Sequence, residues 1–319
     1  MQDLAAGAKR HGQEFIVIGD SKSPREFALG GADFYSLDHQ RSLPLSFARL
    51  CPERHYARKN IGYLLAWQNG ADVIRETDDD NFPRDGFWQD SDRQFSGSVV
   101  ESAGWVNAYR YFTDGNIWPR GLPLDEIASA PTPAPANADC PIQQGLADEN
   151  PDVDAIFRLV LTLPFSFENR ASVALGRGAW CPFNSQNTTW FRDAAVLMYL
   201  PSYCSFRMTD IWRSFVTQRI AWENGWSILF HGATVYQDRN EHNLMRDFAD
   251  EVSGYLNNKA IATELDKLKL RGGPAHIGED LRTCYQALIK MGLIDSAELA
   301  LIDAWLADLA SSSLTAAGS

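Results

Sequence analysis

The feature that most constrains the fold is an alternation of strand and helix patterns near the start of the chain. A short β-branched run, EFIVIGD at 14–20, is followed by a polar loop and a second strand pattern at 33–37. Residues 55–70 then read as an amphipathic helix that stops at Gly70, and ADVIRET at 71–77 is the next strand pattern. This alternation predicts an α/β fold with a mostly parallel sheet flanked by helices, in which ligands bind at the carboxyl ends of the strands.

The rest of the chain predicts further strands and a helical end. Residues 96–113 are rich in strand-forming residues, and SAPTPAPANADCP at 129–141 is predicted to be a linker, because it combines Pro and Ala without periodicity. A helix is predicted over 207–225, a strand directly follows it, and the pattern is helical from about residue 241 onward. We therefore expect an α/β fold with a helical C-terminal part.

Composition and charge bound the class of protein. The chain has 319 residues and a formal net charge of −12, from 29 basic and 41 acidic residues. Such a chain lacks the basic footprint of a nucleic-acid-binding protein. No apolar run is long enough to cross a bilayer, and the first residues lack the apolar core of a signal peptide. We expect a cytoplasmic protein without a transmembrane segment, and leave peripheral membrane association and a homo-oligomeric state open.

Three consecutive aspartates, Asp78, Asp79 and Asp80, directly follow the strand pattern that ends at Thr77. Side chains two residues apart in an extended segment point into the same space, so Asp78 and Asp80 can hold Mg²⁺ or Mn²⁺ together with substrate phosphates. The alternative is a solvated turn, because Asn and Pro follow in the sequence. The residues alone leave both interpretations open.

Further candidate residues have ordinary structural alternatives. Arg58 and Lys59 can contact phosphates, or can belong to an exposed helix face with surface ion pairs. His242 follows a predicted strand and can bind a metal, although a lone His is more often structural. Asp210 begins a predicted helix, where the helix dipole also favours an acidic residue. The acidic turn at 147–154 is either on the acceptor side of a site or merely solvated.

Several long segments resemble one known family. The STELLO-type glycosyltransferases are similar to this chain in ARKNIGYLLAWQNGADVIRETDDDN, WPRGLPLDEI, QGLADENPDVDAIFRL, PFNSQNTTWF and QDRNEHNLMRDF. The resemblance runs in order from about residue 14 to about residue 250, and the last stretch of about 70 residues carries no matching motif. More distantly, the layout is similar to GT-A glycosyltransferases and to reversibly glycosylated polypeptides, which interconvert pyranose and furanose forms of a nucleotide-linked pentose.

The resemblance implies a GT-A-like, Rossmann-type fold and a metal-dependent transferase. Such an enzyme moves a sugar from a nucleotide-sugar donor to a glycan or other hydroxyl acceptor, here in bacterial surface polysaccharide synthesis. GT-A enzymes hold Mn²⁺ or Mg²⁺ with an Asp-x-Asp motif, matched by Asp78 and Asp80, and often with a late His, matched by His242. Inverting members use a carboxylate base near a later helix start, which points to Asp210 as the catalytic residue.

The resemblance also assigns the two sides of the site. The donor-binding candidates are Gly19, Asp20, Arg58, Lys59, Asn60, Asp78 and Asp79. The acceptor-side candidates are Asp148, Trp180, Asn184 and Trp212.

The implied domain organisation is a GT-A-like catalytic domain over 1–250 and a helical C-terminal extension over 251–319. Within the catalytic domain, the nucleotide-sugar half spans about 1–128 and the acceptor half about 141–250. Two other functions stay open. A nucleotide-sugar pyranose/furanose mutase would interconvert ring forms with the donor alone, and a non-catalytic nucleotide-sugar-binding scaffold would form complexes that survive loss of the aspartates.

Overall fold

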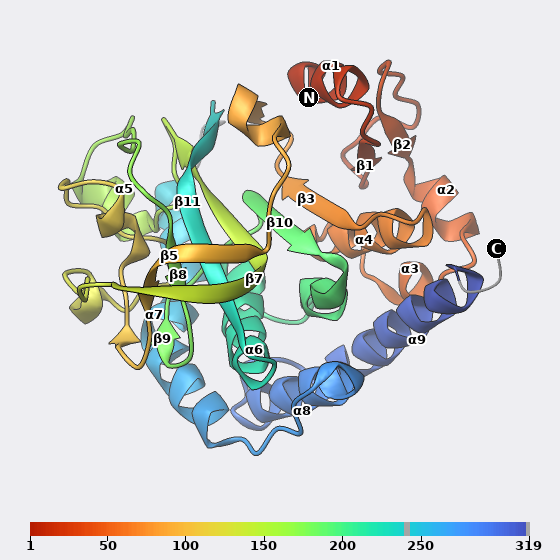
Figure 1. Ribbon diagram of the computed structural model, residues 1–319. Helices are drawn as coiled ribbons and strands as arrows, with labels where there is room; N and C mark the ends of the chain where they lie inside the picture. Colours follow the sequence, from red (N-terminus) through yellow and green to blue (C-terminus); the bar gives the residue numbers. More distant parts are fainter. Residues whose placement is uncertain (239–242, 317–319) are drawn as a thin grey trace.

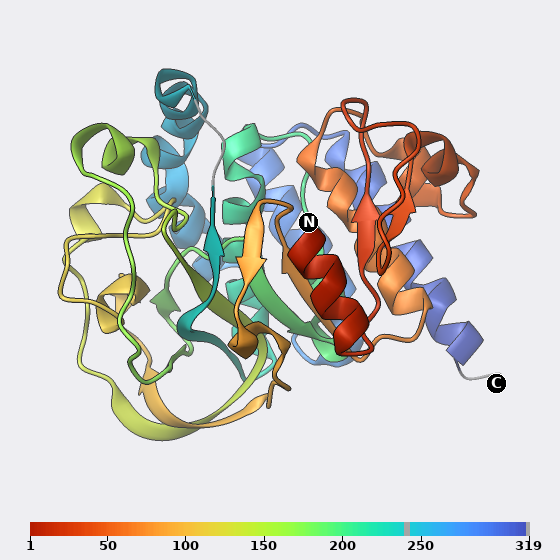
Figure 2. The ribbon, with the colours of Figure 1, turned by 90° about the horizontal axis from the view of Figure 1, so that it is seen from above.

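The structure is a computed structural model that describes residues 1–238 and 243–316 (Figure 1). The N-terminal part holds α1 (Gln2–Arg10), β1 (Ile16–Ile18), β2 (Asp33–Tyr35), α2 (Leu37–Ser42) and α3 (Ser46–Leu50). The strands predicted at 14–20 and 33–37 are therefore confirmed, and they pair in parallel as a two-stranded sheet of their own. Helix α1 packs beside the central sheet, where Gly7 lies against the ring of Trp88 (Figure 2).

The helix and strand that lead to the aspartates are also confirmed. A 3-10 turn at Tyr56–Arg58 continues into α4 (Lys59–Gln68), and β3 (Val73–Thr77) follows. Ile61, Leu64 and Trp67 bury the apolar face of α4 in the main core. Gly70 has a φ of 91°, so it can make the tight turn from α4 into β3 that a side chain would strain.

The central sheet has seven strands in the order β3-β10-β7-β5-β8-β11-β4, with β11 also pairing with β7. Its remaining strands are β4 (Asn81–Pro83), β5 (Gln94–Val100), β7 (Ala134–Asp148), β8 (Val173–Leu175), β10 (Asn187–Phe191) and β11 (Trp226–Gln237), while β6 (Gly104–Trp105) and β9 (Ala179–Trp180) pair separately. The predicted α/β class is confirmed. Parallel pairing joins β7 to β11 and β5 to β8, and the other described neighbours are antiparallel. A turn connects β3 to β4, and a short 3-10 segment connects β4 to β5, rather than the crossover helices that parallel neighbours need.

The prediction of a linker over residues 129–141 is wrong. Residues 134–148 form β7, which lies inside the sheet between β10 and β5. The first residues of β7 pair with β5 on one side, and the pairings of β7 with β10 and β11 begin only further along the strand. Pro135, which has no N–H, therefore lies where a strand on the other side would not need that hydrogen bond. The prediction failed because Pro and Ala at a strand edge have the composition of a linker.

The helices cover the sheet and complete one core. They are α5 (Ala155–Val160), α6 (Thr209–Glu223), α7 (Leu244–Lys267), α8 (Ile277–Lys290) and α9 (Glu298–Ala316). Helix α6 is buried along its length, and α8 and α9 lie along one side of the molecule, with α9 against α3 and α4 (Figure 1). The expected domain boundary at residue 250 falls inside α7. Within residues 1–238 and 243–316, no helix is long and apolar enough to cross a bilayer.

Candidate functional site

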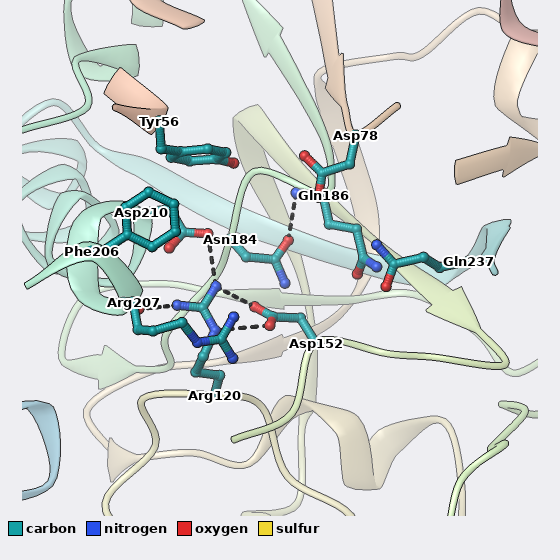
Figure 3. A pocket seen from close by; sticks show the side chains of 10 residues that line it. All are labelled: Tyr56, Asp78, Arg120, Asp152, Asn184, Gln186, Phe206, Arg207, Asp210 and Gln237. Carbon is teal, nitrogen blue, oxygen red and sulfur yellow. Dashed lines mark hydrogen bonds and ion pairs between the residues drawn. The ribbon is translucent and has the colours of Figure 1, made fainter. Parts of the chain in front are cut away.

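A pocket opens where β3 and β11 end, as expected for a ligand at the carboxyl ends of strands (Figure 3). Asp78 follows the last residue of β3, and Gln237 is the last residue of β11. The loops before β10 and α6 close the other sides, and the cavity measures about 100 Å³. Its lining consists of Tyr56, Asp78, Arg120, Asp152, Asn184, Gln186, Phe206, Arg207, Asp210 and Gln237.

Asp78 faces this pocket and is paired with Lys59, which lies at the start of α4 outside the pocket lining. The Lys59 Nζ atom is 2.8 Å from Asp78 Oδ1 and also donates to the Ser185 carbonyl oxygen at 3.1 Å and the Tyr56 hydroxyl at 3.3 Å. Burial raises the pKa of the Asp78 carboxyl, and the neighbouring Lys59 ammonium partly offsets that rise. Lys59, at this basic helix start, therefore contacts one of the three aspartates.

The other two aspartates lie on opposite sides of the chain. Asp79 is exposed, and its carbonyl oxygen accepts a hydrogen bond from the amino group of Met1 at 2.9 Å. The Asp80 carboxylate instead accepts from Gln237 Nε2 at 2.8 Å. Asp80 is close enough to Asp78 to add to the rise in the pKa of the Asp78 carboxyl. The two aspartates of the Asp-x-Asp pattern are thus neighbours: Asp78 lines the pocket, and Asp80 is bonded to Gln237, which also lines it.

The side chains around Asp78 fit a hard divalent cation. Gln237 is only 4% exposed, and its Oε1 atom has no hydrogen-bond partner among the described residues. Asp78, Asp80 and Gln237 therefore offer oxygen atoms, which are the ligands that Mg²⁺ and Mn²⁺ prefer, and substrate phosphates commonly complete such a shell. No group of three His, Cys, Asp or Glu side chains suited to a metal occurs in the described part of the chain. His242, the predicted late ligand, lies outside the described residues.

Asp210 lies across the pocket in the first turn of α6 and is held by Arg120 (Figure 3). Arg120 binds Asp152 through two hydrogen bonds of 2.8 and 2.9 Å, and its Nη2 atom is 3.0 Å from Asp210 Oδ2. The Ser185 backbone N–H donates to the same Asp210 oxygen at 3.3 Å. One oxygen of Asp210 is therefore anchored by two donors, and the carboxylate faces the cavity.

Arg120 and Asp152 are site residues that the sequence interpretation missed. Arg120 belongs to the WPRGLPLDEI segment that carried the family resemblance, and Asp152 belongs to the acidic turn at 147–154. That resemblance was a usable signal for Arg120. Asp148, the residue of the acidic turn predicted from the sequence, is instead buried and bonded to Arg84 and to the Phe167 backbone N–H.

Several predicted donor residues lie away from the pocket lining. The Arg58 guanidinium is buried and donates to Gln40 Oε1 and to the Cys51 carbonyl oxygen. Asn60 exchanges two hydrogen bonds with the backbone of Leu200. Both side chains therefore tie α4 to neighbouring segments.

The loop after β1 likewise bonds to neighbouring segments and not to the pocket lining. Asp20 accepts hydrogen bonds from the backbone N–H groups of Arg54 and His55, both at 2.9 Å. The Gly19 carbonyl oxygen accepts from the Gln40 amide at 2.7 Å. These contacts join β1 to the segment before α4 and leave neither Gly19 nor Asp20 in the pocket lining.

Among the acceptor-side candidates, only Asn184 lines the pocket. Its side-chain oxygen accepts from the Gln186 backbone N–H at 3.0 Å. Trp180 lies in the core, with its ring 4.4 Å from that of Trp222. Trp212 is also buried, and its indole N–H donates to Asn258.

The sheet, its flanking helices and the carboxylates at a strand end define a GT-A-like α/β protein. Comparison with known proteins points to one family: the family model described as STELLO glycosyltransferases matches residues 207–316. Two Arabidopsis thaliana proteins, "Probable glycosyltransferase STELLO2" and "Probable glycosyltransferase STELLO1", are 30% and 29% identical to the chain over 97% of its length. These matches confirm the resemblance to the STELLO-type glycosyltransferases over nearly the whole chain.

The matches also correct the extent of the resemblance. The family model continues through α8 and α9, where the sequence interpretation found no matching motif. The chain covers 43% and 42% of the two Arabidopsis proteins, so it spans less than half the length of these relatives.

Proposed function

We propose that the chain is a metal-dependent glycosyltransferase that moves a sugar from a nucleotide-sugar donor to a hydroxyl group of a glycan or similar acceptor. The observation that carries this proposal is that Asp78 and Asp210, far apart in the sequence, face one pocket. The resemblance to the STELLO family supports the same reaction class. The setting we propose is the synthesis of a bacterial surface polysaccharide.

The charges around the pocket favour a cation as part of the site. Lys59 is paired with Asp78, Arg120 with Asp152 and Asp210, and Arg207 with Glu251. A nucleoside diphosphate would therefore enter among basic groups whose charge is already offset. A divalent cation held by Asp78 and Asp80, with the Gln237 oxygen beside them, would neutralise the leaving diphosphate.

Asp210 suits the role of general base for the acceptor hydroxyl. Its Oδ2 atom is fixed by Arg120 and by the Ser185 N–H, and its Oδ1 atom accepts no hydrogen bond from the described residues. The proton of the acceptor hydroxyl would pass to Oδ1 as the hydroxyl oxygen attacks the sugar. Arg120 would then keep the carboxylate oriented toward the cavity rather than toward the core.

The size of the cavity indicates which part of the substrates it holds. Ligand pockets commonly measure about 300–1,000 Å³, whereas this cavity measures about 100 Å³. It therefore accommodates the reacting groups, while the remainder of each substrate lies over the rim. Phe206 is 52% exposed at that rim beside Tyr56, and an exposed ring of this kind can stack on a sugar face.

A thermal-shift panel of nucleotide sugars with and without Mn²⁺ tests the donor and the cation, because a ligand that binds only the native state raises its apparent stability. We expect one donor to stabilise the protein only with Mn²⁺ and Asp80→Ala to lose this effect without unfolding. Equal stabilisation without Mn²⁺ would contradict the cation assignment. Ring-form interconversion of the donor alone would indicate a mutase instead.

With that donor, Asp210→Asn tests the base. We expect the variant to keep Mn²⁺-dependent donor binding and to lose about 10²–10⁴-fold in sugar transfer, the usual contribution of a general base. Asp148→Asn is the matched control, because Asp148 is a buried, Arg-paired aspartate outside the pocket lining. Transfer by Asp210→Asn at the wild-type rate would rule out this role.

A further inference from the structure

The Lys59 ammonium lies against Asp78, one of the two aspartates proposed to bind the divalent cation. It lies 2.8 Å from Asp78 Oδ1, and its contacts to the Ser185 carbonyl and the Tyr56 hydroxyl use its other two N–H donors. It also lies 5.0 Å from the centre of the Tyr56 ring, within reach of a cation–π contact. Lys59 is therefore held beside Asp78 by three hydrogen-bond partners and not by charge alone.

We infer that Lys59 is an exchangeable internal counter-ion: it occupies Asp78 in the ligand-free protein, gives way to the divalent cation, and then contacts the donor diphosphate. This inference rests on the proposed function. An ammonium 2.8 Å from a carboxylate oxygen and a divalent cation on that same oxygen would repel each other strongly. Both cannot occupy Asp78 Oδ1, so Lys59 must leave it when the cation binds.

The surroundings of Lys59 allow this exchange. Its side chain is 23% exposed, so the flexible four-carbon stem can move the ammonium away from Asp78. Gln237 supplies an independent indication of a cation site, because its buried Oε1 atom has no hydrogen-bond partner among residues 1–238 and 243–316 while its Nε2 atom donates to Asp80. A cation brought to Asp78 and Asp80 would also give the Gln237 oxygen a partner.

The exchange predicts opposite effects on two ligands. Without Lys59, Asp78 has no competing ammonium, so Mn²⁺ alone should bind more tightly. With the cation already bound, the same variant lacks the ammonium that reaches the diphosphate, so a nucleoside diphosphate should bind more weakly. A lysine that served only the fold would weaken both ligands or neither.

Titration of the purified chain with MnCl₂, followed by calorimetry, measures the first effect. We expect Lys59→Met to bind Mn²⁺ about tenfold or more tightly than the wild type, and Asp78→Asn to lose binding. Lys259→Met is the matched control: Lys259 is also paired with carboxylates, those of Asp125 and Glu126, but lies on α7 and not beside Asp78. Its Mn²⁺ affinity should equal that of the wild type.

Titration with uridine, guanosine and adenosine diphosphates at saturating Mn²⁺ measures the second effect. The diphosphate that binds the wild type should bind Lys59→Met about tenfold more weakly. Lys59→Gln, with thermal melting of both variants, separates this effect from loss of folding. Agreement between the two variants supports the exchange.

The outcomes that overturn the inference differ from failure of the proposed function. If the wild type and Lys59→Met bind Mn²⁺ equally and Asp78→Asn does not, the cation site stands but Lys59 does not compete for it. If the wild type binds the diphosphate without Mn²⁺ and Lys59→Met does not, Lys59 is a permanent cation and no exchange takes place. If no variant binds Mn²⁺, the cation of the proposed function fails, and the inference fails with it.

Discussion

At the scale of single residues, a buried ion pair beneath the pocket fixes β3 to α6. Glu76 in β3 binds Arg213 in α6 through contacts of 2.7 and 3.0 Å and accepts the indole N–H of Trp190. Both charged side chains are almost fully buried. Glu76→Gln keeps the shape but leaves Arg213 uncompensated, so we expect it to lower the free energy of unfolding by about 3–5 kcal/mol.

Denaturant unfolding measures this loss. Glu223→Gln is the control, because Glu223 pairs with arginines at a partly exposed position, where the loss should be about 1 kcal/mol or less. Similar losses in the two variants would show that the buried pair does not contribute as proposed.

Single residues were predictable where local sequence places them. Asp78 follows a strand and Asp210 starts a helix, so pattern alone puts both near the ends of elements. Arg120 and Asp152 were missed because their pairing joins loops that are distant in sequence. Arg58 shows the reverse: its charge is visible in the sequence, but only the structure shows its guanidinium turned toward Gln40.

At the scale of elements, the start of α5 carries a titratable cap. Asp154 accepts the backbone N–H of Phe157 and the indole N–H of Trp118 in a buried position, and burial raises its pKa to about 6. An aspartate in an unfolded chain titrates near a pKa of about 3.9, so the native state binds this proton more tightly. Asp154 should therefore lower stability as the pH rises from about 4 to about 6, by about 3 kcal/mol at most.

The free energy of unfolding, measured between pH 4 and pH 7, tests this cap. Asp154→Asn has no proton to exchange there and can still cap α5, so the stability of the wild type relative to this variant should fall as the pH rises. Asp303→Asn, which changes an exposed aspartate of α9, is measured alongside as the control for the substitution itself. A constant difference between wild type and Asp154→Asn would contradict the raised pKa.

Elements were predictable where their pattern was regular, as in α4, α6 and β11. Strand β7 was not, because its identity depends on partners. Its first half looks like a Pro-Ala linker and is a strand only because β5 pairs with it, and its second half is buried between β10 and β11. No local pattern contains that information.

At the scale of the whole molecule, the C-terminal helices complete the core around the site-bearing segments. Trp305 in α9 is fully buried against Phe47 of α3 and Tyr199. The Glu298 carboxylate accepts the backbone N–H groups of Ser202 and Tyr203. The alternation of strands and helices predicted the α/β class, but it did not predict that the core depends on the C-terminal helices. An amphipathic helix has the same sequence pattern whether it forms a separate extension or covers the core of the rest of the chain.

A chain ending at residue 250 tests the expected division into a catalytic domain and a C-terminal extension. Truncation there cuts α7, exposes the core that Trp305 and Tyr285 cover, and removes the Asp308 carboxylate that accepts the first N–H groups of α3. We therefore expect residues 1–250 to lose cooperative thermal unfolding and Mn²⁺-dependent stabilisation together. Asp308→Asn in the full chain should keep both, with a lower melting temperature, because it weakens one helix start and leaves the core covered. Cooperative melting of residues 1–250 near the temperature of the full chain would instead make the C-terminal helices a separate extension. Since α9 packs against α3 and α4, and α4 begins at Lys59, the same truncation should also disturb the ammonium that faces Asp78.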